Sequence, residues 1–557
     1  MKNKTATFKY KTEPFDHQID AYNFARNRDS FALFMEQGTG KTKTIIDLAA
    51  DMYLRGDINA VMIIAPNGVH VQWIREQLPL HSPVAYDGVA FKSTASKSLR
   101  MDIHRICTQD EPELLKFFAV NVEAFSYPTY MSMFYTYVAN HKCFVVIDEA
   151  TGIKNPDAKR TQNIIRGLAE CKWRGKSLIA CEPISTKRAI LTGTPITNSP
   201  FDIWAMAEFL QPGYFKRTYF AFKAHYGLQR KIDVHQGSVI RQVSVPLKLE
   251  ELRDIERLDT LAACQKYNMR ESDVEYIKAN KPEYSYKHLD ELRKEINQFA
   301  FFVTKDECLD LAPKIYKRRV VEMSTEQLRV YTDLEKEFIS NYSGKDLSVL
   351  NKVALYTRLS QIAGGFFPYA EEDEMTGEFT KDIIEFKDNP KASAILEDVL
   401  QVDYPVVVVT RFTAEAKMLY NMFKTKTDLQ VGCYIGELKE PRDPIEAFKN
   451  GFLHVLVANE RMISKGHNLQ NAHVVMFYSN SYSLEERLQT EDRIHRNGQT
   501  EKCLYIDYIA DGSVDMKVYA SLRSNKKLLD YMRGSTIDQF LSEVTDDMKE
   551  EFIWLKD

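Results

Sequence analysis

Residues 31–50 read FALFMEQGTGKTKTIIDLAA, and this stretch decides the fold. An apolar run from Phe31 to Met35 leads into a short turn with two glycines, and helical periodicity begins near Lys41. A strand that enters a helix through a glycine-containing turn is the context in which a phosphate-binding loop is credible. The stretch therefore predicts an α/β fold together with a site for nucleotide phosphates.

The residue types in this turn suit phosphate binding. Gly38 and Gly40 let the backbone curl so that its N–H groups face the phosphates at the N-terminus of a helix. Lys41 adds a cation, and the Thr42 hydroxyl can ligate magnesium. Met35 stands where the pattern G-x-x-x-x-G-K-[ST] has its first glycine, so the match is not strict. The alternative is an ordinary glycine turn before a helix.

Short apolar runs alternate with helix-like stretches on both sides of a long charged region. The first set of runs is FALFM (31–35), AVMIIAP (60–66), FFAVNV (117–122), CFVVID (143–148) and AILTGT (189–194). The second set is VVVVT (406–410), CYIG (433–436), HVLVANE (454–460) and HVVMFYS (473–479). Strands that alternate with helices imply parallel sheets covered on both faces. The sequence predicts two such α/β lobes.

The region between the two sets consists mainly of long charged amphipathic runs, which predict helices. We therefore expect a first lobe over residues 1–214, a helical insertion and linker over 215–391, and a second lobe over 392–557. KRRVVEM (317–323) is a brief strand candidate within the insertion, and the acidic residues 371–389 are expected to form a surface loop. From residue 521 onward we expect helices that pack on the second lobe.

The overall composition excludes several classes of protein. A formal net charge of −4 and a pI of about 6.4 deny a globally basic surface, so any nucleic acid must be bound by local patches. The eight cysteines contain no C-x-x-C pair, which predicts reduced thiols rather than a zinc site. No run of 18 apolar residues and no signal-like N-terminus occurs. We therefore expect a cytoplasmic protein without membrane contact.

An acidic pair follows one of the predicted strands. The run CFVVID ends at Asp148, and Glu149 comes next. Because the carboxyl ends of parallel strands meet at one rim of a sheet, these acids should lie near the phosphate loop. Asp148 is predicted to hold magnesium through water, and Glu149 to polarise the attacking water. The alternative is a solvated turn.

Two arginines near the end of the second lobe are candidates for catalysis. Arg493 and Arg496 stand three residues apart in QTEDRIHRNGQ (489–499) and are predicted to share one face of a helix. Hydrolysis builds charge on the γ-phosphoryl group, and an arginine supplied by another lobe raises the rate about 10³- to 10⁵-fold in well-studied nucleotidases. The alternative is a pair of surface charges.

Taken together, these segments resemble the Swi/Snf-type ATPases of helicase superfamily two, in the compact form found in bacteria and their viruses. The similarity extends from about Phe15 to Lys526. It is carried by an ordered series of motifs: PFDHQ (14–18), EQGTGKT (36–42), IIAPNGVHVQWIRE (63–76), DEATGIKN (148–155), LTGTPITNSPFDIW (191–204), TRF (410–412), YIGELKEPRDPIEAF (434–448), VLVANERMISKGHNLQNAHVVMF (455–477) and QTEDRIHRNGQ (489–499).

The resemblance implies a fold of two tandem RecA-like parallel-sheet lobes with a mainly helical insertion, and it implies the cofactors ATP and Mg²⁺. Gln18 looks like the family's adenine-reading glutamine. The nucleotide-binding set that the resemblance implies is Gln18, Gly38, Thr39, Gly40, Lys41, Thr42, Gly466 and Gln489. Its catalytic set is Lys41, Asp148, Glu149, Arg493 and Arg496, and its metal ligands are Thr42 and Asp148.

The chain departs from the family pattern at two places. Thr151 replaces the usual histidine of the DEAH box, and the magnesium-binding and water-activating acids remain. Ile463 and Ser464 replace two glycines that precede Gly466. ATP hydrolysis should survive the first change, whereas the second puts the coupling of hydrolysis to movement in doubt.

The resemblance further implies a monomeric motor that tracks on double-stranded or branched DNA without obligatory strand separation, associated with a nucleoid or with viral DNA. Phosphate contacts are expected at Lys154, Thr194, Arg411 and Lys465, and solvated surface charges are the alternative for the three cations. The helical insertion is a candidate surface for a protein partner. Two other functions stay open, a strand-separating helicase and an ATP-binding scaffold that barely hydrolyses ATP.

Overall fold

The computed structural model describes residues 8–109, 113–174, 177–236, 239–282, 284–342, 349–372, 379–436, 443–464 and 467–533. The chain divides into two compact units. The first unit comprises Met1–Cys308 and Leu528–Asp557, and the second comprises Leu309–Lys527. This division falls within the predicted insertion, because residues 215–308 belong to the first unit. Among the helices of the described ranges, none is long and apolar enough to cross a membrane.

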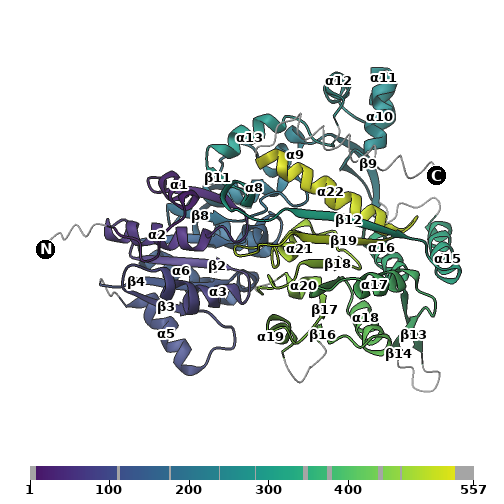
Figure 1. Cartoon of the computed structure of the whole chain (residues 1–557). Helices are drawn as coiled ribbons and strands as arrows, with labels where there is room; N and C mark the ends of the chain where they lie inside the picture. The colour runs from purple at the N-terminus through teal and green to yellow at the C-terminus, as the bar shows by residue number, and fades with distance from the viewer. Residues whose placement is uncertain are drawn as a thin grey trace. The chain divides into compact units, whose positions relative to one another are not determined.

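The first unit is built on a seven-stranded sheet in which every pairing is parallel. Its order is β11-β1-β8-β5-β2-β4-β3. The strands are β1 (Ser30–Met35), β2 (Ala60–Ala65), β3 (Tyr86–Ala90), β4 (Leu115–Asn121), β5 (Cys143–Asp148), β8 (Lys187–Leu191) and β11 (Ala300–Val303). All residues of β2 and β5 are buried, as expected for strands covered on both faces (Figure 1).

Helices and two hairpins complete the first unit. The helices are α1 (Asp16–Ala25), α2 (Lys41–Leu54), α3 (Val69–Gln72), α4 (Leu78–His81), α5 (Lys97–Thr108), α6 (Met131–Asn140), α7 (Lys159–Gly167), α8 (Ile203–Leu210), α9 (Tyr219–Tyr226), α10 (Leu249–Arg257), α11 (Thr260–Tyr267), α12 (Glu271–Asn280), α13 (Leu289–Asn297) and α14 (Lys305–Cys308). The hairpins are β6 (Ala169–Arg174) with β7 (Ser177–Pro183), and β9 (Gln229–Gln236) with β10 (Val239–Pro246). Figure 1 shows α10, α11 and α12 projecting beyond the sheet, where a small core around Leu252 and Ile277 holds them together.

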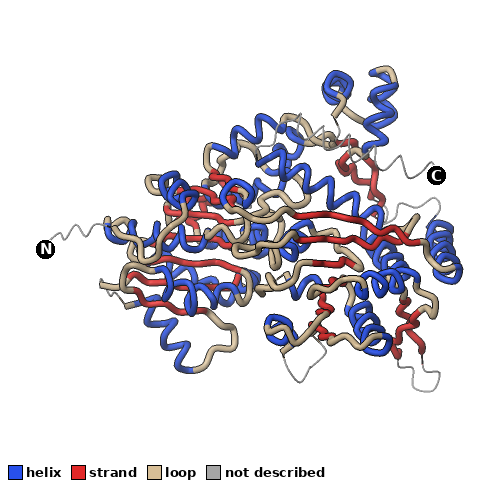
Figure 2. The backbone as a smooth tube through the Cα atoms, viewed as in Figure 1, coloured by secondary structure: helices blue, strands red, loops and turns tan. Residues whose placement is uncertain are grey.

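The second unit contains a six-stranded parallel sheet in the order β12-β19-β18-β15-β17-β16. Figure 2 shows strands of the chain in red and helices in blue. Its strands are β12 (Lys314–Val321), β15 (Val406–Thr410), β16 (Val431–Tyr434), β17 (Val455–Asn459), β18 (Val474–Phe477) and β19 (Cys503–Ala510). Its helices are α15 (Thr325–Tyr342), α16 (Val349–Ala363), α17 (Pro390–Leu400), α18 (Thr413–Lys426), α19 (Pro444–Lys449), α20 (Glu460–Ile463), α21 (Leu484–Glu491) and α22 (Val514–Arg533). Alternate residues of β15 enter two separate cores, so both faces of this sheet are buried.

The predicted fold class is confirmed, with three local differences. Residues 300–303 lie in the region that was predicted to be mainly helical, but they form the edge strand β11, which pairs with β1. Part of the predicted loop 371–389 forms a hairpin of β13 (Phe366–Glu372) and β14 (Phe379–Glu385). The last residues of α22 belong to the first unit rather than the second, and Leu528, Leu529 and Met532 are buried.

Candidate nucleotide site

The loop between β1 and α2 has the backbone shape that a phosphate cradle requires. Gly38 and Gly40 both adopt positive φ angles, +87° and +86°, and Gly40 is the residue from which α2 begins. A Cβ atom on Gly40 would lie 2.0 Å from Nε2 of Gln18, so any side chain there would displace the Gln18 amide. Glycine is needed at Gly40 both for its left-handed conformation and for the close approach of Gln18.

Lys41 lies against this loop. Its side chain is buried, and Nζ donates to the carbonyl oxygens of Met35 at 2.8 Å and Glu36 at 3.2 Å. Thr39 donates its hydroxyl to the same Glu36 oxygen at 2.7 Å. Thr42 follows as the second residue of α2 and is half-buried. The cation and the predicted hydroxyl ligand therefore stand at the first turn of a helix, where the helix dipole favours an anion.

Gln18 is brought to the loop by α1. Its Nε2 donates to the carbonyl oxygen of Thr39 at 3.1 Å, and its Oε1 accepts from the backbone N–H of Phe15 at 3.1 Å. The His17 ring contacts the same Thr39 oxygen at 2.7 Å. Sequence reasoning assigned no role to His17, because a single histidine beside a motif glutamine carries no signal of its own. Both side chains hold the loop from the α1 side.

Asp148 stands at the end of β5, two strands from the phosphate loop in the sheet order β1-β8-β5. It is buried, and its carboxylate accepts from the Trp73 indole N–H at 2.9 Å and from the backbone N–H of Glu149 at 3.0 Å. Burial raises the pKa of Asp148, whereas the Trp73 hydrogen bond and the charge of Lys41 lower it. Lys41 is thus electrostatically linked to this acid.

Glu149 adopts a left-handed backbone conformation with φ of +50°. A non-glycine residue in this region costs on the order of 1–3 kcal/mol, and such strain clusters at functional sites. The side chain is half-buried, next to the buried acid. Thr151, which replaces the family's histidine, is buried in the short helical turn that follows.

The motif LTGTPITNSPFDIW (191–204) forms the loop after β8, and internal hydrogen bonds hold this loop in a fixed shape. Asp202 accepts from the backbone N–H and the hydroxyl of Thr197, at 3.0 and 3.1 Å. Thr194 is buried, and its backbone N–H donates to Thr192 Oγ1 at 3.0 Å. Lys154, a predicted DNA contact, donates to Thr197 Oγ1 at 2.7 Å. This hydrogen bond links the acidic motif to the loop after β8.

The arginines of the second unit lie beyond helix α21, not on it. Helix α21 ends at Glu491, and Arg493 and Arg496 follow in tight turns, so the prediction that they share one helix face is wrong. Arg493 is buried, and its guanidinium donates to the Ser464 carbonyl oxygen through Nε at 3.1 Å and Nη2 at 2.5 Å. Burial lowers the pKa of the half-buried Arg496.

Gln489 does lie on α21, where its Nε2 is 3.4 Å from Glu485 Oε1. Gln499, near the end of the same motif, is buried and donates to the carbonyl oxygens of Gln470 and Ala472 at 2.9 and 3.2 Å. These two bonds tie the arginine turns to the preceding motif. Lys465 and Gly466 lie outside the described residues.

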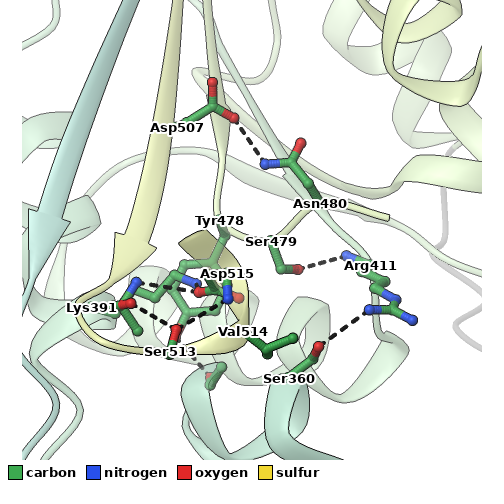
Figure 3. A network of polar contacts seen from close by, with 12 residues as sticks. Ser360, Lys391, Arg411, Tyr478, Ser479, Asn480, Asp507, Ser513, Val514 and Asp515 are labelled. Carbon is green, nitrogen blue, oxygen red and sulfur yellow. Dashed lines mark hydrogen bonds and ion pairs between the residues drawn. The ribbon is translucent and has the colours of Figure 1, made fainter. Parts of the chain in front are cut away.

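Arg411 is anchored by two serines (Figure 3). Its backbone N–H donates to Ser479 Oγ at 2.8 Å, and Nη1 donates to Ser360 Oγ at 3.3 Å. Ser479 in turn donates to the buried Glu415 at 2.5 Å. Figure 3 also shows Asn480, whose amide donates to Asp507 at 2.8 Å. Arg411 is half-buried and positioned from both sides.

Comparison with known families decides the assignment. Residues 17–362 match the SNF2-related domain, and residues 391–498 match the helicase conserved C-terminal domain. The first match alone covers more than half of the 557 residues. The chain belongs to the Swi/Snf-type ATPases. The expected family is therefore confirmed.

Curated Swi/Snf relatives are distant and much longer. Human chromodomain-helicase-DNA-binding protein 6 is 25% identical over 257 residues, which cover 45% of this chain and 9% of the relative. Human DNA excision repair protein ERCC-6-like is 21% identical over 540 residues, covering 91% of this chain and 40% of the relative. The chain thus spans less than half the length of these proteins.

A solved structure that matches nearly the whole chain is the Sulfolobus solfataricus SWI2/SNF2 ATPase core in complex with double-stranded DNA. It is 19% identical, with a TM-score of 0.37, and the match covers 95% of this chain and 97% of that one. The fold of this Swi/Snf chain is established by its own two parallel sheets.

Proposed function

We propose that this Swi/Snf chain hydrolyses ATP and uses the energy to move along double-stranded or branched DNA. The observation that carries the hydrolytic part is the placement of Lys41 and Asp148 on one parallel sheet, where Lys41 opens the helix after β1 and buried Asp148 ends β5. A phosphate-binding lysine and a buried acid at one rim of a parallel sheet are the parts that nucleotide hydrolysis needs.

Magnesium fits the residues at this rim. Asp148 offers a carboxylate and Thr42 a hydroxyl, and hard oxygen ligands of this kind suit Mg²⁺. In the described ranges no group of three or more His, Cys, Asp or Glu side chains could hold a metal by itself. A bound Mg²⁺ would therefore take some of its ligands from the nucleotide phosphates, and it would neutralise part of their charge. Trp73 would keep the Asp148 carboxylate oriented toward it.

The remaining catalytic roles are proposed for Glu149, Arg493 and Arg496. Glu149 is proposed to orient and polarise the attacking water from its strained position after Asp148. Arg493 and Arg496 are proposed to stabilise the charge that develops on the γ-phosphoryl group. Thr39, Gln18, Gln489 and Gly466 complete the proposed nucleotide-binding set.

Phosphate release with and without duplex DNA tests the hydrolytic part. Lys41→Ala removes the phosphate-binding cation and should lower the rate by about 100-fold or more. Glu149→Gln should lower it by about 10² to 10⁴ while leaving nucleotide binding intact. Lys142→Ala, an exposed lysine of the same unit, is the matched control. If the wild-type rate equals that of both active-site variants, the chain is a nucleotide-binding scaffold instead.

Movement along DNA is tested separately from hydrolysis. Displacement of a triplex-forming strand, without unwinding of a plain forked duplex, supports translocation. Efficient unwinding of the fork would instead support the strand-separating helicase.

Contacts to DNA phosphates are proposed for Lys154, Thr194, Arg411 and Lys465. Phosphate contacts release counterions, so DNA stimulation of the ATPase should weaken with salt. Lys154→Ala or Arg411→Ala should each reduce the salt slope by about one. Lys266→Ala, on the projecting insertion, is the control. An unchanged slope in both variants would exclude these two residues as DNA contacts.

A further inference from the structure

Glu36, the first residue of the phosphate loop, is held by two groups that come from much later in the chain. Its Oε2 accepts from the backbone N–H of Lys305 at 2.9 Å. Its Oε1 accepts from Nη1 of Arg533 at 2.5 Å, in an ion pair whose arginine side chain is only 10% exposed. The Glu36 backbone carbonyl meanwhile accepts from Thr39 and Lys41. Glu36 thus supports the phosphate loop through its backbone carbonyl, while its side chain is held by Lys305 and Arg533.

Arg533 also forms a hydrogen bond to the loop that follows β8. Its Nη2 donates to the carbonyl oxygen of Gly193. Gly193 packs directly on the phosphate loop, because a Cβ atom there would lie 3.2 Å from the Gln37 nitrogen and 3.3 Å from the Glu36 Cα. One guanidinium therefore bridges the ends of the adjacent parallel strands β1 and β8. A planar group with several fixed donors can make such a bridge, whereas an ammonium acts as a single point charge.

Lys305 contacts the phosphate loop from the side of the edge strand β11. It is buried, it opens α14 directly after β11, and its Cε lies 3.8 Å from the position that a Cβ on Gly38 would occupy. Strand β11 is itself paired with β1 in register, with Met35 opposite Val303. The phosphate loop is therefore bounded by a cation from each of two segments, and the cation carried by α22 also reaches the loop after β8.

We propose that Arg533 is a positioning residue of the nucleotide site: it fixes the phosphate loop to the loop after β8 and so preorganises both for ATP. The proposal rests on the ATPase function proposed above. A loop already held in its binding shape loses less conformational freedom when nucleotide binds, so affinity is the quantity that Arg533 should control. Without Arg533, we expect nucleotide affinity to fall about tenfold, a typical consequence of losing one charge-assisted contact.

Titration of the full chain with a fluorescent ADP analogue tests this role. Arg533→Ala should raise the dissociation constant about tenfold. Arg533→Lys should give an intermediate value, because it keeps the charge but not the fork. Glu36→Gln should weaken binding as well, and Glu36→Gln combined with Arg533→Ala should add little to either, since both remove the same contact. Arg523→Ala is the matched control, an arginine of the same helix that bonds to Tyr519.

The outcomes separate this inference from the proposed function. Unchanged affinity in Arg533→Ala, tighter binding, or fully additive losses in the double variant would each overturn the positioning role. If the affinity shifts appear while the wild type releases no phosphate with DNA, the ATPase proposal fails and the positioning role stands. Circular dichroism checks folding, and if Arg533→Ala does not fold, Arg533→Lys with Glu36→Gln carries the same comparison.

Discussion

Trp73 lies outside the phosphate loop and orients Asp148, the acid proposed to hold magnesium. Its indole N–H donates to Asp148 in a site where burial alone favours the protonated acid. Trp73 lies in a family motif, but its role could not be predicted from the sequence, because its hydrogen bond to Asp148 joins residues 75 positions apart. Lys41, Asp148 and Glu149 could be predicted because their types and spacing follow a strand, whereas His17, Trp73 and Arg533 could not.

Trp73→Phe is expected to weaken magnesium use. The substitution removes one donor to a buried carboxylate and keeps most of the ring volume, so the carboxylate loses a fixed orientation. The magnesium concentration for half-maximal phosphate release should rise by roughly tenfold, and excess magnesium should restore much of the rate. Trp204→Phe, which loses a hydrogen bond to the Arg217 carbonyl instead, is the control. A loss of rate at every magnesium concentration would argue against this role.

Buried Glu415 makes the stability of the second unit depend on pH. Burial raises the pKa of Glu415 from 4.5 to about 7, because the charged form is poorly solvated there. The folded protein therefore holds this proton more tightly than the unfolded chain, and the stabilisation present below pH 4.5 is lost as pH rises through 7.

Urea unfolding of wild type and Glu415→Gln at pH 4.5 and 8 measures this effect. Relative to wild type, the variant should gain roughly 3 kcal/mol between the two pH values, because it cannot ionise. Burial likewise raises the pKa of Glu460 to about 7, so Glu460→Gln should behave in the same way. A constant difference between variant and wild type would show that Glu415 titrates alike in both states.

At the scale of elements, the strands with continuous apolar runs were predictable and the short or charged ones were not. VVVVT and CFVVID became β15 and β5 because residues buried on both faces must all be apolar. The edge strand β11 was missed because only two residues separate AFFV from the last residue of α13, and neither is a glycine or a proline. The turns that carry Arg493 and Arg496 were taken as helix because their spacing suits one, although α21 ends at Glu491.

Gly40→Ala tests whether the α1–loop contact limits the shape of the phosphate loop. The new Cβ would meet Gln18, and the residue would also be strained at its positive φ. Gly56→Ala is the matched control, because Gly56 has a φ of +78° with nothing within 4 Å of its Cβ position. Backbone strain should lower the folding stability of both variants by about 1–2 kcal/mol. Only Gly40→Ala should lose nucleotide affinity, by about tenfold or more. Equal affinity in the two variants would contradict the steric account.

At the scale of the whole molecule, two units with separate cores are expected to unfold in separate steps. The second unit contains a buried charge network in which Arg487 pairs with Glu491 at 2.9 Å and Asp507 at 2.5 Å. The charges of Lys314 and Arg487 hold the pKa of Glu491 down at about 2, against the effect of burial.

Arg487→Met should destabilise the second unit alone. It leaves two buried carboxylates without their shared cation, which costs about 3–5 kcal/mol in comparable networks. Calorimetry should show one transition moving to lower temperature and the other staying in place. Arg461→Met, which removes an exposed ion pair of 3.6 Å with Glu486, should change stability by less than about 1 kcal/mol. A shift of both transitions would mean that the units unfold together.

The discontinuity of the first unit has a consequence for how the protein is made. Residues up to Cys308 form most of it, but the segment from Leu528 onward, with Arg533, belongs to it as well. A ribosome must therefore synthesise the entire second unit before the nucleotide loop can receive its last contact, although domains generally fold in the order of their synthesis. A nascent chain halted before residue 533 would lack the contact between Arg533 and the phosphate loop, so full nucleotide affinity is expected only after residue 533 has been synthesised.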